Sequence, residues 1–396
     1  MKKLMILGAG IYQVPLIETA KRMGLYTIVV SYPGKYPGFS LADKIYELDT
    51  TDWRQILQAA SDEGIDGICT TGTDVAVRTI GHVTKELNLP GIPLKAAEIL
   101  TDKYLMKQAF KENGIRSAEF LPVFSLEEAK EALLKLGSPA VLKVTDSSGS
   151  RGVIKVHNED ELETAYQSAK TYTRKPYLLM EAFIDAVEIG IDAFVSDNKI
   201  VMSLAHDKII YKGSKTTVPV GHHFPYSGSN PELLNDIQNQ LQRLVQGTGM
   251  NNCAINMDAF VKDNRLYTIE AGGRAGATCI PELVSMYGGF DYYEQMIKNA
   301  LGMPVDFSIK GSRACSAKLL YSEKKGTLSK IYPDRIQSLK EEDIYVSLDY
   351  DAGTPIEAME NGTDRIGQVY FPHDTEEEYE KKLNLAMETY ELVFEK

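Results

Sequence analysis

The sequence predicts a mixed fold, in which an α/β region comes first and an α+β region follows. From the N-terminus to Leu87, apolar strand segments alternate with helical segments, a pattern typical of a parallel sheet with crossover helices. Beyond Gly114 the chain changes to hairpins and short helices. The length of 396 residues allows two or three domains.

In the first region we expect strands at residues 4–7, 27–30 and 67–70, and helices at 12–23, at 53–63 and up to residue 87. The turn Gly8-Ala9-Gly10 raises the alternative of dinucleotide binding. However, Gln13 stands where the G-x-G-x-x-G motif needs its third glycine, and Ser31 stands where a ribose-binding acid would follow the second strand. A substrate-facing loop is the favoured interpretation.

The later region should contain helices at 101–113, 125–136, 159–169 and 231–247, and strands at 140–145, 153–156, 177–180 and 188–195. Thr101 is the expected cap of the first of these helices. Residues 206–226 are polar and hold three of the six histidines, so they predict a long functional loop or lid. The last segment, 306–396, should form mixed strands and a final acidic helix at 375–395.

The composition argues against several classes of partner. The net charge is −12, which disfavours nucleic acid and anionic membranes as main partners. No apolar run approaches the roughly 20 residues that a membrane helix needs, and the N-terminus does not resemble a signal peptide. The four cysteines are widely spaced, as expected for reduced thiols in the cytoplasm. They are Cys69, Cys253, Cys279 and Cys315.

The most informative stretch runs from Asn256 to Arg274. Two extended runs flank the polar turn 262–265, so a hairpin would set Asp258 and Glu270 side by side. Two adjacent carboxylates favour a cation between them, and oxygen ligands favour Mg²⁺. Arg274 would then offer a donor fork to phosphate or carboxylate. The alternative is an ordinary surface hairpin with solvated acids.

Two further stretches could bind a nucleotide. Lys143 ends a strand, and the Ser/Gly-rich stretch from Ser148 to Gly152 follows, which suits an anion cradled by backbone N–H groups. The alternative is a flexible hairpin with a solvated lysine. An exposed strand edge at 181–184 could bind an adenine by backbone hydrogen bonds, and a nearby acid could accept from ribose hydroxyls. The alternative is that these acids are solvated residues of a linker, which would have the same sequence pattern.

The order and spacing of these motifs resemble the ATP-grasp superfamily over nearly the whole chain. The motifs are, in order, Lys103, Lys143 with its loop, residues 181–188, and Asp258 with Glu270 and Arg274. The resemblance implies a biotin-carboxylase-like parallel domain at 1–97 and an ATP-grasp core at 98–305. It also implies a lid subdomain at about 115–185 and an α+β region at 306–396.

The resemblance also implies roles for single residues. Arg274 is the implied catalytic residue, and Asp258 and Glu270 are the implied metal ligands. The implied nucleotide-binding residues are Lys103, Lys143, Ser148, Gly149, Ser150, Arg151, Gly152, Glu181, Phe183, Ile184, Glu188 and Phe260.

One position departs from the family pattern. The usual E-x-N-x-R motif is here Glu270-Ala271-Gly272-Gly273-Arg274, so Gly272 replaces the asparagine of the second metal shell. Either water fills that position or Asn256 substitutes; a local hydrogen bond is the favoured interpretation of Asn256. The number of metal ions, one or two, is left open.

The resemblance implies a carboxylate–amine ligase that uses ATP and Mg²⁺ (or Mn²⁺), passes through an acyl phosphate and releases ADP and phosphate. The motif around Arg274 looks like the L-amino-acid ligase branch, so small amino-acid-derived substrates and a cytoplasmic homodimer are expected. The alternatives are a purine-pathway ATP-grasp ligase or carboxylase and an inactive nucleotide-binding protein. The candidates for a base are His206, His222 and His223, although a merely solvated histidine is the more common case.

Overall fold

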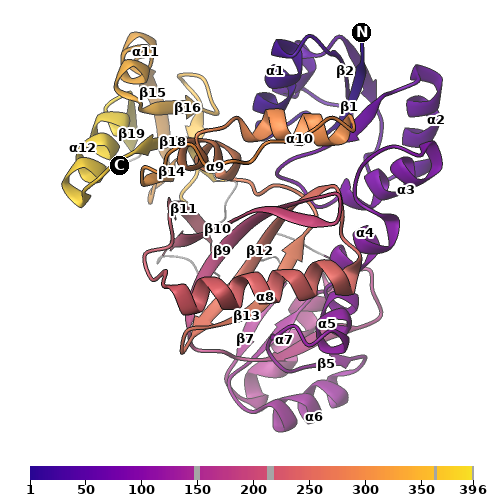
Figure 1. Ribbon diagram of the computed structural model, residues 1–396. Helices are drawn as coiled ribbons and strands as arrows, with labels where there is room; N and C mark the ends of the chain where they lie inside the picture. The colour runs from indigo at the N-terminus through magenta and orange to yellow at the C-terminus, as the bar shows by residue number, and fades with distance from the viewer. Residues whose placement is uncertain (147–151, 212–217, 361–363, 395–396) are drawn as a thin grey trace.

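The computed structural model describes residues 1–146, 152–211, 218–360 and 364–394. A parallel sheet occupies the N-terminal region, and antiparallel sheets follow it (Figure 1). The predicted combination of α/β and α+β architecture is confirmed. The division of the chain into domains at residues 97 and 305, with a lid subdomain between them, remains a prediction.

All four strands of the N-terminal sheet run parallel, in the order β3-β2-β1-β4. They are β1 (Lys3–Leu7), β2 (Tyr26–Ser31), β3 (Lys44–Glu47) and β4 (Gly67–Cys69). The helices α1 (Val14–Arg22), α2 (Trp53–Glu63) and α3 (Val77–Leu87) lie where the sequence predicts them. Strand β3 was not predicted, because its alternating polar residues carry no apolar run.

Gln13 closes the loop that follows β1. The Gly10 N–H donates to Gln13 Oε1 (2.9 Å), and Gln13 Nε2 donates to the carbonyl oxygen of Thr71 (2.5 Å). Gly8 has φ +99°, and a Cβ atom there would lie 2.8 Å from the Gln13 side chain. The residue that breaks the dinucleotide motif therefore connects the loops that follow β1 and β4.

A second sheet has the antiparallel order β5-β8-β6-β7. Its strands are β5 (Phe120–Val123), β6 (Ala140–Lys143), β7 (Val153–Val156) and β8 (Leu178–Ala182), and its helices are α6 (Leu126–Leu136) and α7 (Glu159–Lys170). Helix α5 (Lys103–Glu112) precedes this sheet. Its cap is Asp102 rather than the predicted Thr101, because the Thr101 hydroxyl donates back to the Ala97 carbonyl oxygen (2.8 Å).

The largest sheet has eight strands in the order β13-β12-β9-β10-β11-β14-β18-β16. Helix α8 (Pro231–Thr248) lies across it in Figure 1, α10 (Tyr292–Ala300) lies between it and the N-terminal region, and α9 (Ile280–Gly288) lies beside β14. The strands are β9 (Val187–Ser196), β10 (Lys199–Ile210), β11 (Pro219–Phe224), β12 (Cys253–Lys262), β13 (Arg265–Gly272), β14 (Cys315–Tyr321), β16 (Tyr345–Leu348) and β18 (Arg365–Pro372).

The prediction of a loop or lid over 206–226 is wrong for most of that segment. Strands β10 and β11 pair as a hairpin, and residues 212–217 lie outside the described part of the chain. His206 and His222 are buried rather than solvated. The polar residues of β10 find partners on neighbouring strands, and the sequence of one segment does not show such partners.

The C-terminal region adds a small sheet in the order β17-β15-β19. Its strands are β15 (Gly326–Ile331), β17 (Pro355–Ile356) and β19 (Tyr390–Phe394), and its helices are α11 (Pro333–Leu339) and α12 (Glu376–Met387). The predicted final helix therefore ends early, at Met387. Residues after it form β19, which pairs with β15 and has a tyrosine, a valine and a phenylalanine suited to a strand.

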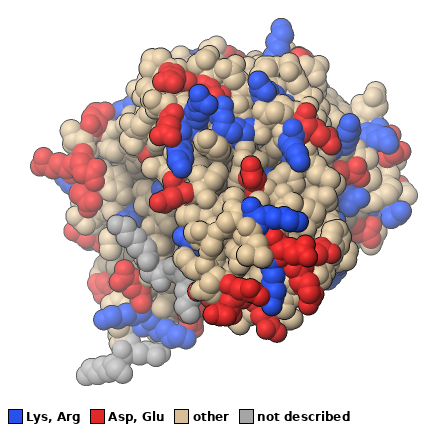
Figure 2. Space-filling model, turned by 90° about the horizontal axis from the view of Figure 1, so that it is seen from below, with Lys and Arg blue, Asp and Glu red and all other residues tan. Residues whose placement is uncertain are grey.

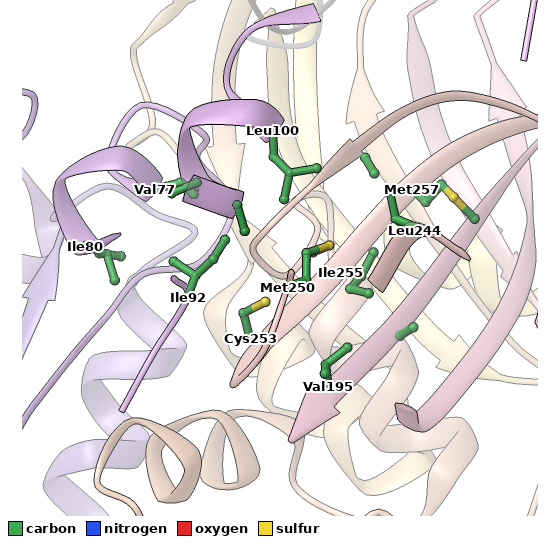
Figure 3. Packing of buried hydrophobic residues seen from close by; sticks show 14 of the residues in the cluster. Val77, Ile80, Ile92, Leu100, Val195, Leu244, Met250, Cys253, Ile255 and Met257 are labelled. Atoms are coloured by element: carbon green, nitrogen blue, oxygen red, sulfur yellow. The ribbon is translucent and has the colours of Figure 1, made fainter. Parts of the chain in front are cut away.

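One apolar core joins the N-terminal helices to the large sheet. Figure 3 shows Val77 and Ile80 of α3 and Leu100 of α4 (Leu94–Leu100) in one apolar cluster with Ile255 and Met257 of β12. All of these side chains are at most 6% exposed. Because α5 begins directly after α4, this packing fixes the start of α5 beside the hairpin β12–β13.

Acidic and basic side chains are mixed on the surface (Figure 2), although the net charge is negative. Figure 2 shows acidic and basic side chains interspersed on the face seen from below. Within the described residues, no helix is long and apolar enough to cross a membrane. The four cysteines are buried free thiols.

Candidate active site

A cleft of about 600 Å³ lies between the N-terminal region and the large sheet. It brings together four predicted site residues from distant parts of the sequence. These are Lys103 of α5, Asp258 of β12, Glu270 of β13 and Arg274 beyond β13. Polar residues that the sequence analysis did not select also line it, namely Asp74, Arg78, Asp102, Thr145, Asp146 and Lys175.

The hairpin predicted from 256 to 274 is present. Asp258 and Glu270 are direct register partners, and Asp263 and Asn264 turn the chain with φ values of +50° and +56°. The register shifts after Asp258, so the chain bends directly beside the carboxylate pair. Side chains of direct partners point to the same face of a sheet, which explains why both carboxylates reach the cleft.

Lysines neutralise the two carboxylates. Lys103 Nζ lies 2.5 Å from Glu270 Oε2. Burial raises the pKa of Glu270, but the charge of Lys103 outweighs burial and brings that pKa to about 2. Glu270 is therefore an anion at neutral pH and can attract a cation.

Lys208 is a site residue that the sequence analysis missed. Its Nζ lies 2.5 Å from Glu188 Oε1 and 3.0 Å from Asp258 Oδ1. Burial lowers the pKa of Lys208, but the charges of Asp258 and Glu188 outweigh it and raise the pKa. The only signal in the sequence was a lysine in the polar run after His206, which was interpreted as a loop.

Lys143 meets Glu181 inside the second sheet. Its Nζ lies 3.0 Å from Glu181 Oε2, and Lys107 Nζ lies 3.2 Å from the same oxygen. The expectation that Glu181 stands on an exposed strand edge is wrong, because β8 lies between β5 and β6 and Glu181 is buried. Lys143 remains close enough to Glu270 to lower the pKa of that carboxyl group.

Arg274 is held by two partners. Its Nε lies 2.8 Å from Asp74 Oδ1, and its Nη2 donates to Asp74 Oδ2 (2.9 Å). Its Nη1 donates to Asn256 Oδ1 (2.5 Å), and Asn256 Nδ2 donates in turn to Asp192 Oδ1 (3.2 Å). Both ends of the Asn256 amide are thus engaged locally, as the favoured interpretation of this residue expects.

The glycine that departs from the family motif has a steric role. A Cβ atom on Gly272 would lie 2.9 Å from Asp74 Oδ1 and 3.4 Å from Arg274 Cζ. Because glycine has no Cβ, Asp74 can approach the guanidinium group from the N-terminal region. The sequence marked Gly272 as unusual, but Asp74 carried no signal.

The other predicted nucleotide-binding residues do not line this cleft, or they lie outside the described residues. Phe260 is the register partner of Glu188, and Lys155 Nζ lies 3.6 Å from the ring centroid of Phe183. Ile184 follows β8 and is half-buried, and Gly152 has φ +70°. Ser148, Gly149, Ser150 and Arg151 lie outside the described residues.

The three candidate bases do not lie in a solvated loop. His206 Nε2 lies 3.1 Å from Asp192 Oδ2 deep in the sheet. Burial lowers the pKa of His222 well below its usual value, so this histidine is neutral. His223 Nδ1 lies 3.0 Å from Ser316 Oγ.

Comparison with known proteins gives a consistent picture. Residues 136–282 match the ATP-grasp domain. Phosphoribosylglycinamide synthetase from Anaerococcus prevotii superposes with a TM-score of 0.83, at 30% identity and with 100% of both chains covered. L-amino acid ligase from Bacillus licheniformis gives 0.82 at 20% identity, covering 100% of this chain and 99% of that one. Alanine–anticapsin ligase from Bacillus subtilis is 26% identical over 59% of this chain and 54% of its own length.

The chain belongs to the ATP-grasp superfamily. Within it, the protein is an ADP-forming ligase that makes carbon–nitrogen bonds, of the carboxylate–amine ligase class.

Proposed function

We propose that this protein joins an amino-acid carboxylate to an amine, by transferring the γ-phosphoryl group of ATP to the carboxylate and releasing ADP and phosphate. The observation that carries the proposal is the cleft itself. Lys103 pairs with Glu270, Lys208 pairs with Asp258, and Arg274 lies in the same cleft. Phosphoryl transfer between anions needs cationic groups positioned in this way beside the reacting groups.

In this proposal Lys103 and Lys143 bind the phosphates of ATP, and the loop Ser148–Gly152 covers them. Glu188 accepts from the ribose hydroxyls, and Phe260, its neighbour on β12, packs on the adenine. The backbone of Glu181 is already paired within the sheet, so Phe183 and Ile184 just beyond β8 are the better candidates for the adenine edge. Glu181 itself then holds the phosphate-binding Lys143 in place.

Asp258 and Glu270 would hold Mg²⁺. The donor set fits this ion, because it offers two neighbouring carboxylates and Mg²⁺ takes its remaining ligands from water and phosphate oxygens. When bound, the ion would neutralise charge on the phosphates. Both ends of the Asn256 amide are engaged, which supports water at the position of the family's asparagine.

Arg274 would stabilise the transferring phosphoryl group and the oxyanion that forms when the amine attacks the acyl phosphate. Asp74 and Asn256 fix the plane of its guanidinium group, so the donor is oriented before substrate arrives. Such preorganised donors contribute most of the electrostatic stabilisation in comparable reactions.

The amino-acid substrate class is supported by the two relatives that are named amino acid ligases. A purine-pathway reaction is the second candidate, and the 30% identity with phosphoribosylglycinamide synthetase over the whole chain favours it. The predicted homodimer and the predicted lid subdomain at about 115–185 also remain part of the proposal.

A release assay tests the proposal directly. The protein is incubated with MgATP and pairs of amino acids, and ADP and phosphate are measured; bicarbonate with an aminoimidazole ribonucleotide tests the purine alternative. We expect phosphate release with at least one amino-acid pair, and a fall of about 10²–10³ in rate for Arg274→Ala. Arg335→Ala, which removes a surface ion pair with Glu388 and a hydrogen bond to the Glu388 carbonyl oxygen, is the matched control. Release of AMP instead of ADP would overturn the proposal.

A further inference from the structure

A buried charged pair lies in the large sheet and has no part in the proposed reaction. Asp192 of β9 and His206 of β10 are 0% and 1% exposed, and His206 Nε2 lies 3.1 Å from Asp192 Oδ2. The contact is an ion pair rather than an aligned hydrogen bond, since neither atom has a hydrogen-bond partner within the described residues. Removing two charges from water costs about as much free energy as their attraction returns, so stability alone does not explain this pair.

The His206 ring is held in place from both sides. A Cβ atom on Gly190 would lie 2.1 Å from His206 Nε2, so the ring lies directly on that glycine and reaches across it to Asp192. The Phe224 ring stacks on the His206 ring at 4.6 Å. His206 Nδ1 lies 3.1 Å from the carbonyl oxygen of Asp207. Both ring nitrogens thus face groups that only accept, as suits an imidazolium.

Two other titratable groups beside the pair are neutral. The His222 ring lies 4.9 Å from the His206 ring, and burial together with the charge of His206 lowers the pKa of His222 well below its usual value. Burial, with the charge of Asp192 as a second cause, raises the pKa of Tyr292 well above its usual value. His222 Nδ1 and Tyr292 Oη have no hydrogen-bond partner in the described part of the chain. His206 is therefore the group that balances the charge of Asp192.

The pair reaches the cleft through Asn256. Asn256 Nδ2 donates to Asp192 Oδ1 (3.2 Å), and Asn256 Oδ1 accepts from Arg274 Nη1 (2.5 Å). Asp192 and Asn256 are register partners, so their side chains lie on the same face of the sheet. A carboxylate only accepts and a guanidinium group only donates, so a single orientation of the amide satisfies both. Asp192 thus determines which end of Asn256 faces Arg274.

We infer that Asp192 and His206 are positioning residues for Arg274 and act on it through Asn256. His206 balances the charge of Asp192, the carboxylate holds the amide in one orientation, and the amide oxygen fixes the guanidinium group. Neither Asp192 nor His206 is among the residues that line the cleft. The inference rests on the role proposed for Arg274. An asparagine at 192 would fit either orientation of the Asn256 amide, and one of them turns an NH2 group toward Arg274.

NMR of the full chain tests the inference without requiring turnover. The rate of rotation about the Nε–Cζ bond of Arg274 is measured, and its signal is assigned by its absence in Arg274→Lys. We expect rotation about 10-fold faster in Asp192→Asn and in His206→Gln, as for a weakened hydrogen bond to a charged group. The matched control is Asp236→Asn, which removes a carboxylate that pairs with Arg116 and accepts from the Leu266 N–H. It should leave the rotation unchanged.

The phosphate-release assay supplies a second measurement. The kcat of Asp192→Asn should fall about 10-fold to 100-fold with an unchanged KM for ATP, because only the orientation of one catalytic group changes. In an Arg274→Ala background the same substitution should have no further effect, because the group that it positions is absent.

A cooperative denaturant transition reports folding in every variant, and His206→Gln decides the question if Asp192→Asn does not fold. The inference is overturned if rotation in the folded variants equals that in the wild type. It is also overturned if Asp192→Asn slows the wild type and Arg274→Ala by the same factor. Faster rotation without phosphate release from any substrate pair would refute the ligase reaction alone, and release with unchanged rotation would refute the positioning role alone.

Discussion

At the residue scale, Gly272 shows how an absent side chain shapes the site. Asp74 occupies the space that a Cβ atom on residue 272 would need, and from there it forms an ion pair with Arg274. The family's asparagine would not fit this arrangement without displacing Asp74. The departure from the motif is therefore linked to a partner of Arg274 that comes from the N-terminal region.

We expect Gly272→Ala to lower kcat/KM by about 10-fold to 100-fold, because a small misplacement of a positioned catalytic group has effects of that size. Stability should change by no more than about 1 kcal/mol, since only the end of the Asp74 side chain must move. Phosphate release and denaturant unfolding measure the two effects. Gly311→Ala, where a Cβ atom would meet nothing within 4 Å, is the control. Unchanged kinetics would show that the Asp74 contact is irrelevant to the reaction.

Lys208 has a different consequence, because it neutralises two carboxylates at once. Lys208→Met leaves Glu188 and Asp258 without their cation, and we expect a loss of about 3–5 kcal/mol in the free energy of unfolding. Added Mg²⁺ should restore more stability to this variant than to the wild type, since the ion replaces the missing charge. Thermal unfolding with and without Mg²⁺ measures this difference.

The control for that experiment is Lys130→Met, whose partner Glu159 is 59% exposed and whose loss should cost only about 0–1 kcal/mol. An equal response of Lys208→Met and wild type to Mg²⁺ would argue against a metal at Asp258.

The position of a site residue could be predicted only where the sequence pattern of its own segment determines which residues it lies beside. The hairpin around Asp258 and Glu270 could be found in this way, because alternation and turn residues fix its register. Asp74, Lys107 and Lys208 could not, since their partners come from other segments of the chain. Their environment exists only after the chain has folded.

At the scale of elements, regular patterns predicted most helices and strands, and two local rules failed. The end of β10 and all of β11 were taken for a loop, because the charged side chains there are satisfied across the sheet rather than by water. The final helix was predicted to continue over the residues of β19, because glutamate favours helix. In the structure these residues form a strand, since they pair with β15.

Glu63 connects two elements of the first sheet and gives a pH-dependent prediction. Hydrogen bonds from Lys44 and Tyr46 of β3 lower the pKa of this last residue of α2 from 4.5 to about 2. Because the pKa in the folded chain is the lower one, the unfolded chain binds more protons between these values. The stabilisation is therefore complete above pH 4.5 and is lost as the pH falls toward 2.

Glu63→Gln should thus lower the free energy of unfolding by about 1–3 kcal/mol at neutral pH. The gap to the wild type should shrink as the pH falls below 4.5, the usual pKa of a glutamate carboxyl. Denaturant unfolding over a pH series measures it, and the exposed Glu86→Gln is the control. A gap that stays constant over the whole series would contradict the assignment.

At the scale of the whole molecule, the fold class followed from the change of pattern along the chain, but the position of the cleft did not. The cleft depends on the apolar core that presses α3 and α4 against β12 and so brings Lys103 to Glu270 (Figure 3). Contacts between segments more than 150 residues apart leave no periodic signal in either segment. Only the resemblance to a family placed these residues together in advance.

The eight-stranded sheet runs without interruption from β13 to β16, across the predicted boundary at residue 305. If the chain ended at this boundary, β11 would lose its partner β14. The unpaired backbone N–H and C=O groups of β11 would then form an exposed sheet edge, which favours aggregation. Strands β14, β18 and β16, which follow residue 305, are thus continuous with the large sheet. A different C-terminal region could replace this one in evolution only if it supplied a strand that pairs with β11 as β14 does.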